Sequence, residues 1–224
     1  MKKYAIIVAG GAGTRMGTEV SKQFLEIKGK PVLMHSMNRF FDFDEHIILI
    51  IVLPEHQIAY WKKLCIAHNF IVPHQIVKGG TERFYSVKNG LSLVEENALV
   101  AIHDAVRPLV SKQTINDAFE SAMEYGSGIP TVSMNDSIRQ FEGENNFAVN
   151  RSNYKIIQTP QCFLSSGIKA AFNQDFKIEF TDDATVLESF GGKIKTTIGN
   201  IENIKITSPR DLIIATALLD SIEQ

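Results

Sequence analysis

The chain has 224 residues, of which 44% are hydrophobic and 21% charged, and its formal net charge is -2 at pH 7. This composition is typical of a soluble globular protein, and the near-neutral charge gives no reason to expect nucleic acid or a membrane as a partner. The two cysteines lie far apart without CxxC spacing, which argues against a disulfide framework or a zinc site. We expect one domain over residues 1–224. The apolar run after the N-terminal lysines is too short to span a bilayer, so we expect a cytoplasmic location.

The chain opens with an apolar run over residues 4–9, which predicts a buried strand, followed by the glycine-rich segment GGAGTRM at residues 10–16. Glycine lets successive N–H groups converge on one anion, and Arg15 and Lys22 add two positive charges. The segment lacks the third glycine of a dinucleotide-binding loop, because Met16 stands there, and it lacks the Gly-Lys-Ser/Thr of a P-loop. The interpretations left open are a polyphosphate-binding loop and a structural turn with solvated charges.

The rest of the chain alternates between strand-like and helix-like segments. Strands are predicted at residues 46–53, 71–77, 98–102, 129–132, 193–198 and 203–207. Helices are predicted at residues 31–41, 55–68, 111–125 and 165–173, after Thr81, after Thr181 and at 208–223. This alternation predicts an α/β fold with a mainly parallel sheet, in which ligands bind at the carboxyl ends of the strands.

The loop at residues 79–87 has two glycines followed by Thr81, which we expect to cap a helix. The free N–H groups of that helix would hold a base or a ribose. Ser86 lies one turn into the helix, where its hydroxyl has two possible roles, bonding a nucleobase edge or bonding back to a helix carbonyl.

The strand at residues 98–102 leads into His103-Asp104-Ala105-Val106-Arg107-Pro108. A carboxylate at the end of a parallel strand is well placed for Mg²⁺, which binds through a carboxylate and substrate phosphates. Asp104 is therefore the candidate metal ligand. Arg107 is expected either to pair with Asp104 or to contact phosphate, and His103 is interpreted as structural.

Residues 134–158 break the alternation and are predicted to form a β-hairpin around Gly143, with Arg151 on the returning strand. An isolated hairpin is only marginally stable, and this one carries Phe141 and Phe147. A second copy of the chain is the simplest surface against which it would pack.

Two later segments carry further candidates. Thr181 is expected to cap the helix that it precedes, with Asp182 and Asp183 at the positive end of the helix dipole. Lys205 lies within the strand predicted at residues 203–207, where its charge would point to solvent.

Several of these motifs occur in one order: GGAGTRM with Lys22, GGTERxxSV, HDAVRP, Arg151 eight residues before TPQ, TDDA and NIKIT. In this the chain resembles the family of 2-C-methyl-D-erythritol 4-phosphate cytidylyltransferases of the nonmevalonate isoprenoid pathway. The resemblance implies attack of the substrate's phosphate on the α-phosphorus of CTP, with release of pyrophosphate in the presence of Mg²⁺. It also implies a homodimer with a Rossmann-like core of a mainly parallel twisted sheet flanked by helices. A protruding β-hairpin arm, residues 134–158, would help to build the partner's site.

The resemblance also implies roles for individual residues. Those expected to bind the nucleotide are Ala9, Gly10, Gly11, Ala12, Gly13, Gly80 and Ser86. Those expected to be catalytic are Arg15, Lys22, Asp104 and Lys205. Those expected to hold the acceptor are Asp104, Arg107, Thr181 and Lys205, with Arg151 and Thr159 from the neighbouring arm.

The chain departs from the family pattern at Ser21, where proline is usual, and at Val106, where alanine is usual. An alternative enzyme is a cytidylyltransferase for ribitol 5-phosphate or a related pentitol phosphate. The segments Thr81-Glu82-Arg83 and Thr181-Asp182-Asp183 resemble the methylerythritol family more closely and favour the methylerythritol substrate. A non-catalytic nucleotide sensor is an alternative of another class. It predicts the loss of Arg15, Lys22 or Asp104, and all three are present.

Overall fold

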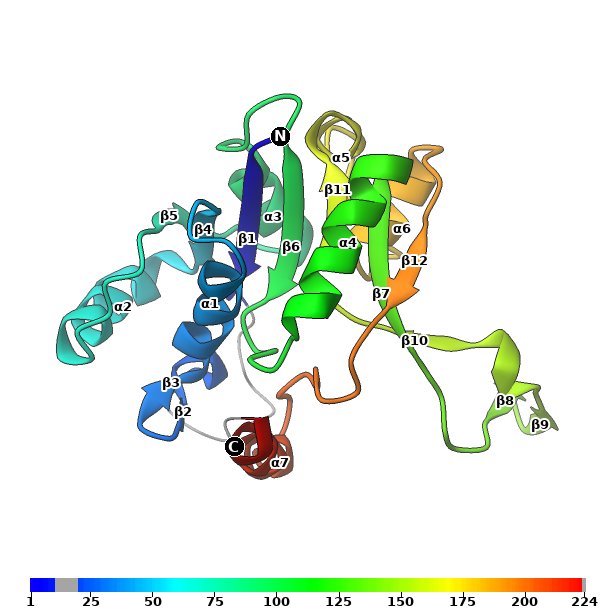
Figure 1. Cartoon of the computed structure of the whole chain (residues 1–224). Helices are drawn as coiled ribbons and strands as arrows, with labels where there is room; N and C mark the ends of the chain where they lie inside the picture. The colour runs from blue at the N-terminus through cyan, green and yellow to red at the C-terminus, as the bar shows by residue number, and fades with distance from the viewer. Residues whose placement is uncertain (11–19, 223–224) are drawn as a thin grey trace.

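The protein is built on an eight-stranded sheet with helices on both faces (Figure 1). The computed structural model describes residues 1–10 and 20–222. The strands of the main sheet follow the spatial order β10-β7-β11-β6-β1-β4-β5, and β12 pairs with β7. Their bounds are β1 Lys3–Val8, β4 Ile48–Leu53, β5 Gln75–Lys78, β6 Leu99–Asp104, β7 Ser127–Ser133, β10 Lys155–Ile157, β11 Gln161–Leu164 and β12 Thr196–Ile198.

The described helices agree with the alternation expected from the sequence. They are α1 Val32–Phe43, α2 Glu55–Ala67, α3 Arg83–Leu91, α4 Lys112–Tyr125, α5 Ser165–Ala171, α6 Asp183–Ser189 and α7 Pro209–Ile222. Two short 3-10 helices are η2 Lys22–Phe24 and η3 Arg151–Asn153. Within the described part of the chain, no helix is both long enough and apolar enough to cross a membrane.

The prediction of a mainly parallel sheet is confirmed, with a local exception. Strand β1 runs parallel to both β4 and β6, β4 runs parallel to β5, and β12 runs parallel to β7. The exceptions are β10 and β11, which pair antiparallel with their neighbours. Four of the five main-sheet strands that precede β10 in the chain, namely β1, β4, β5 and β6, thus form a parallel unit whose carboxyl ends meet at one edge.

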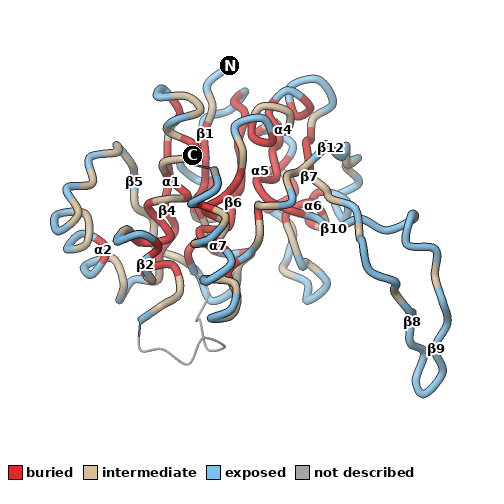
Figure 2. The backbone as a smooth tube through the Cα atoms, turned by 60° about the horizontal axis from the view of Figure 1, so that its bottom comes forward, coloured by how far each residue is buried: buried red, intermediate tan, exposed pale blue. Residues whose placement is uncertain are grey.

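Side chains of the central strands alternate between two hydrophobic cores, as the two-residue period of a strand requires. On β1, Ala5 and Ile7 pack with α1 and α4, whereas Tyr4 and Ile6 pack with α3 and α5. Figure 2 shows buried residues concentrated along these strands. Because both faces of the sheet are covered, the strands are rigid supports for the loops at their ends.

The boundaries of α4 follow the predicted signals. Ser111 is the N-cap, and its Oγ accepts a hydrogen bond from the N–H of Thr114 at 3.1 Å. Gly126 ends the helix with φ of +87°, a left-handed conformation that favours glycine.

Two predicted caps are wrong by one residue. The N-cap of α3 is Glu82 rather than Thr81, and its side chain makes no capping bond. The N-cap of α6 is Asp182 rather than Thr181. Its carboxylate accepts from the N–H of Thr185 while the Thr185 hydroxyl bonds the Asp182 N–H, and this reciprocal capping box fixes the start of α6.

The strand predicted at residues 203–207 is also wrong, since these residues have an irregular conformation. The N–H of Ile206 donates to Val106 O at 2.9 Å, and the Ile206 side chain is buried with Ala215 and Leu219 of α7. Packing against α7 therefore decides the course of this segment, in place of a strand ladder.

The predicted hairpin is present as strands β8 Arg139–Glu142 and β9 Asn145–Ala148, which pair antiparallel and project away from the main sheet (Figure 1). Phe141 and Phe147 on it are 71% and 51% exposed. Arg151 lies in η3 and not on the returning strand, because the Asn150 side chain accepts from the N–H of Ser152 and turns the backbone there.

Candidate active site

The loops after β1 and β6 lie side by side at the carboxyl edge of the sheet. Val8 and Asp104, the last residues of these parallel strands, are register partners. Ala105 N donates to Val8 O at 3.0 Å, and Ala9 N donates to Val52 O at 2.9 Å. Pairing of the strands therefore brings the glycine loop and the Asp104 loop together, as the sequence predicts for ligand-binding loops.

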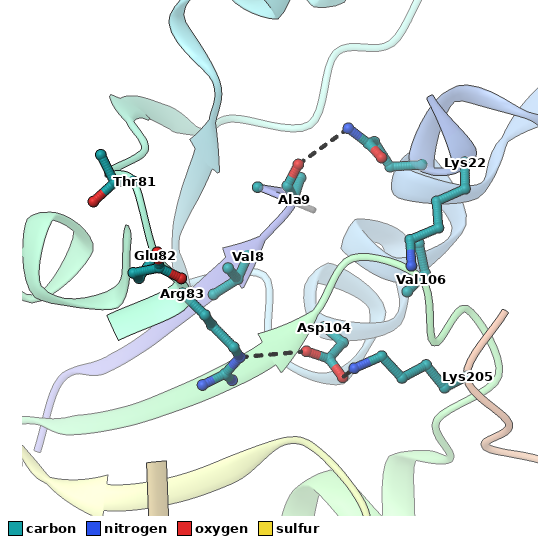
Figure 3. A pocket seen from close by; sticks show the side chains of 11 residues that line it. Val8, Ala9, Lys22, Thr81, Glu82, Arg83, Asp104, Val106 and Lys205 are labelled. Atoms are coloured by element: carbon teal, nitrogen blue, oxygen red, sulfur yellow. Dashed lines mark hydrogen bonds and ion pairs between the residues drawn. The ribbon is translucent and has the colours of Figure 1, made fainter. Parts of the chain in front are cut away.

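Two adjoining pockets occupy this edge, and they share the side chains of Arg83, Asp104 and Lys205. The first pocket has a volume of about 330 Å³ and is lined by Val8, Ala9, Gly10, Lys22, Gln23, Thr81, Glu82, Arg83, Asp104, Val106 and Lys205 (Figure 3). The second pocket has a volume of about 300 Å³ and is lined by Arg83, Asp104, Arg107, Ile157, Gln158, Thr159, Gln161, Thr181, Asp182 and Lys205. Two ligands bound in these pockets would meet at Asp104.

Asp104 lies between three cationic side chains. Its Oδ2 is 2.9 Å from Lys205 Nζ and 3.4 Å from Arg107 Nε, and its Oδ1 is 3.8 Å from Arg83 Nε. Burial alone would raise the pKa of Asp104, but these three cations hold it well below its usual range. The carboxylate thus stays ionised and orients the cations at the junction of the pockets.

Lys205 differs from its sequence expectation. The residue is exposed, as expected, but the irregular segment that replaces the predicted strand also brings its ammonium group to Asp104 (Figure 3). The expected pairing of Arg107 with Asp104 is present, and Arg107 Nη1 also donates to Asn203 O at 2.7 Å.

Arg83 and Asp183 form an ion pair that the sequence did not indicate. Arg83 Nη1 and Nη2 each donate to one oxygen of the fully buried Asp183 at 2.7 Å. Burial would lower the pKa of Arg83, but the Asp183 carboxylate raises it overall. Burial raises the pKa of Asp183, and the guanidinium opposes that shift. The two-point contact locks the guanidinium beside Asp104.

We expect the substitution Arg83→Met to lower the free energy of unfolding by about 3 kcal/mol, because it leaves the Asp183 carboxylate buried without its partner. Urea unfolding followed by circular dichroism measures this change. The double variant Arg83→Met/Asp183→Asn is expected to be more stable than Arg83→Met alone. A loss of less than about 0.5 kcal/mol in Arg83→Met would show that the pair does not stabilise the fold.

Ser86 lies next to both glycine-rich loops. Its Oγ accepts from the N–H of Gly80 at 3.1 Å, and a Cβ atom added to Gly10 would lie 3.3 Å from the same Oγ. Ser86 therefore lies where both loops meet, and neither of the two sequence interpretations included this bond. The other predicted loop residues, Gly11, Ala12, Gly13 and Arg15, lie outside the described residues.

Lys22 begins η2 and lines the first pocket. The next residue, Gln23, is buried and donates from Nε2 to Ala9 O at 3.0 Å. This hydrogen bond holds the turn that carries Lys22 against the end of β1. Figure 3 shows the Lys22 side chain directed toward the region of Asp104 and Lys205.

Thr159 lies within its own chain's second pocket, which corrects the expectation that it comes from a neighbouring arm. Its Oγ1 accepts from the Asp104 N–H at 3.1 Å and lies 3.0 Å from His103 Nδ1. Burial lowers the pKa of His103 to about 4, and the other ring nitrogen lies 3.0 Å from Arg107 O. His103 is therefore a neutral structural residue that supports the loop, as the sequence indicated.

Thr181 and Arg151 occupy different places. Thr181 is exposed and lines the second pocket. Arg151 is exposed on the arm, where it hydrogen-bonds Asn135 O, and it lines neither pocket of its own chain.

Sequence comparison with known proteins shows the family to which this chain belongs. A sequence profile described as IspD, 2-C-methyl-D-erythritol 4-phosphate cytidylyltransferase, matches residues 4–221. The chain is 48% identical to the enzyme of that name from Porphyromonas gingivalis over 221 residues, which cover 98% of this chain and 99% of the relative. It is 46% identical over 219 residues to that from Bacteroides thetaiotaomicron, covering 98% of this chain and all of the relative. The chain belongs to the IspD family.

Structural similarity agrees with IspD membership. The crystal structure of 4-diphosphocytidyl-2C-methyl-D-erythritol synthase from Anaerococcus prevotii matches with a TM-score of 0.82 and 28% identity, covering 98% of each chain. These findings confirm the resemblance, the Rossmann-like fold and the assignment of a nucleotidyltransferase enzyme. They favour the methylerythritol phosphate family over a pentitol phosphate cytidylyltransferase.

Proposed function

We propose that this member of the IspD family transfers CMP from CTP to 2-C-methyl-D-erythritol 4-phosphate. The products are 4-diphosphocytidyl-2-C-methyl-D-erythritol and pyrophosphate. The observation that carries this assignment is the pair of pockets that meet at Asp104, with Lys22 on one side, Arg107 on the other, and Lys205 shared by both. An acceptor phosphate in the second pocket and a triphosphate in the first would face each other there.

The nucleotide occupies the first pocket in this proposal. Ala9 and Gly10 line this pocket and would meet the triphosphate with their backbone groups. Gly80 and Ser86, which are hydrogen-bonded to each other next to Gly10, would hold the cytosine. The residues assigned to the same ligand that lie outside the described part are Gly11, Ala12, Gly13 and Arg15. Glycine at positions 11 and 13 allows the close approach of backbone N–H groups to phosphate.

The reaction needs positioning and charge stabilisation, without a protein nucleophile. The acceptor phosphate is already anionic and attacks the α-phosphorus, and the bond to the pyrophosphate oxygen breaks. Lys22 would stabilise charge on the α-phosphate and the departing pyrophosphate, and Lys205 would hold the attacking phosphate. Both ammonium groups act without a proton transfer.

The acceptor occupies the second pocket. Arg107 and Lys205 supply positive charge for its phosphate, whereas Asp104, Thr159 and Thr181 offer oxygen atoms for its hydroxyl groups. Arg151 would complete this site from a second subunit, because it lines neither pocket of its own chain.

We propose that Mg²⁺ is held mainly by the phosphates of CTP, with Asp104 as the protein ligand. In the described part of the chain, no group of three or more His, Cys, Asp or Glu side chains is placed to hold a metal ion. Mg²⁺ commonly uses one or two carboxylates together with phosphate oxygens and water. Asp104, one of the two carboxylates that line the triphosphate pocket together with Glu82, is placed for an ion that arrives with CTP. When bound, the ion would neutralise charge on the phosphates.

The chain is proposed to be one domain, residues 1–224, that forms a homodimer through the arm at residues 134–158. Support comes from the exposed apolar side chains of this arm, which are Phe141, Phe147, Tyr154, Ile156 and Ile157. We also assign the enzyme to the cytoplasm, since the apolar run near the N-terminus is the buried strand β1.

If Arg151 contributes to the second pocket of the partner subunit, a dimer of one Arg151→Ala subunit and one Lys22→Ala subunit is expected to be active, although each variant alone is inactive. Co-expression of Arg151→Ala and Lys22→Ala subunits with different affinity tags gives dimers with one complete site, because one subunit keeps Lys22 and receives Arg151 from its partner. Random pairing predicts about a quarter of the wild-type rate in the mixture. Activity no higher than that of each variant alone would contradict a contribution from the partner.

The acceptor is tested by pyrophosphate release from CTP and Mg²⁺, with 2-C-methyl-D-erythritol 4-phosphate and ribitol 5-phosphate in separate reactions. Release is expected only with methylerythritol phosphate. Release only with ribitol 5-phosphate would assign the enzyme to pentitol phosphates, and no release with either acceptor would favour a nucleotide sensor.

A further inference from the structure

The turn that carries Lys22 is tied to α2 by side-chain hydrogen bonds. Gln57 donates from Nε2 to Ser21 Oγ at 2.8 Å, and its Oε1 accepts from Gln23 Nε2 at 2.7 Å. The same Gln23 nitrogen donates to Ala9 O at 3.0 Å. The residues on both sides of Lys22 are therefore joined to a helix and to the end of β1.

Gln57 is well placed to act as an anchor. It lies in the first turn of α2, where its backbone N–H donates to Pro54 O at 2.9 Å, and it is half-buried. It does not line the first pocket, but it lines a separate surface pocket with Ser21 and Tyr60. A side chain on a helix holds a neighbouring turn more accurately than one on a loop.

The backbone of Ser21 has φ of -61° and ψ of 138°. A proline ring fixes φ near this value, at about -65°. A proline at this position would restrain φ covalently, and Ser21 has no such restraint. The hydrogen bond from Gln57 to the Ser21 hydroxyl restrains Ser21 instead. A proline at this position would have no hydroxyl to accept that bond.

We propose that Gln57 is a positioning residue for Lys22. Its hydrogen bond to Ser21 keeps the turn in the conformation that directs Lys22 into the first pocket. The inference rests on the proposed role of Lys22 in the transfer reaction. Loss of the anchor would weaken an interaction that matters most when charge builds on the phosphates, so the effect is expected in kcat.

A double-mutant cycle tests this proposal. Gln57→Met and Ser21→Ala are each expected to lower kcat about tenfold, with KM for CTP and for the acceptor changed less than about twofold. The double variant is expected to be no slower than Gln57→Met alone, because both changes remove the same hydrogen bond. Gln113→Met is the matched control, since Gln113 is an exposed helical glutamine that donates to Asp117 and lines neither pocket of the site.

Rescue by proline provides a second readout. In a Ser21→Pro background, Gln57→Met is expected to lower kcat less than about twofold, because the ring would restrain φ. The proposal is overturned if Gln57→Met does not lower kcat or if its effect adds fully to that of Ser21→Ala. An equal effect of Gln57→Met with and without Ser21→Pro would also overturn it. If the proline variant does not fold, the alanine cycle decides.

Lys22→Ala, assayed in parallel, distinguishes a failure of the proposed Gln57 anchor from a failure of the proposed catalytic role of Lys22. An inactive Lys22→Ala beside a fully active Gln57→Met rejects the anchor alone. A fully active Lys22→Ala rejects the catalytic role of Lys22, and with it the reason for an anchor.

Discussion

Replacing Lys22 by alanine is expected to lower kcat about 1000-fold. Lys22 enters the first pocket from η2, and no other described lysine lines that pocket except Lys205. A fixed ammonium group beside the α-phosphate stabilises the charge that develops as pyrophosphate leaves, and removal of one such group typically costs a factor of about 100 to 1000 in kcat. Steady-state kinetics with CTP and 2-C-methyl-D-erythritol 4-phosphate measure the loss.

The fold of the Lys22→Ala variant is expected to be intact, with a melting temperature within about 2 °C of wild type, because Lys22 lies in a short surface turn. Lys63→Ala on the exposed face of α2 is the matched control and should retain full activity. Full activity of Lys22→Ala would refute its assigned role.

Asp104→Ala is the second substitution with a large expected effect. Removing this carboxylate leaves Arg83, Arg107 and Lys205 facing one another without the anion between them. We expect kcat/KM to fall about 1000-fold and the free energy of unfolding to fall by about 2 kcal/mol, since a buried charge network loses its centre. Kinetics and urea unfolding measure the two effects separately.

Asp104→Asn separates charge from shape, because the amide keeps the size of the side chain. It is expected to unfold closer to wild type than Asp104→Ala while remaining at least about 100-fold slower. Asp44→Asn is the control, since Asp44 forms an ion pair with Lys3 at 2.8 Å away from the pockets. Wild-type kinetics for Asp104→Asn would show that the carboxylate charge is not needed.

The sequence predicted those parts of the site that follow from strand order. The apolar run before the first glycines and the apolar run before Asp104 both indicated buried parallel strands. Because such strands end at one edge, the meeting of Ala9 and Gly10 with Asp104 was predictable, and the structure places them in one pocket. The start and end of α4 were predictable because Ser111 and Gly126 act through purely local bonds.

Contacts between distant segments were not predictable in this way. Arg83 and Asp183 are 100 residues apart in the sequence. A carboxylate at the N-terminus of a helix is already favoured by the helix dipole, so the sequence offered no reason to look for a distant partner of Asp183. Lys205 lies in a sequence whose alternation is typical of a strand, but packing of Ile206 against α7 overrides that local preference. The Gln57 bond to Ser21 likewise joins two surface segments that have no shared pattern.

We propose that the enzyme transfers CMP directly to an acceptor phosphate at the junction of the two pockets. Phosphorus NMR of a reaction containing the protein, CTP, Mg²⁺ and 2-C-methyl-D-erythritol 4-phosphate tests it most directly. We predict the paired signals of a diphosphate diester and the signal of pyrophosphate, appearing in equal amounts as the acceptor phosphate signal disappears. Unchanged CTP, or pyrophosphate formed without the diester, would contradict the account.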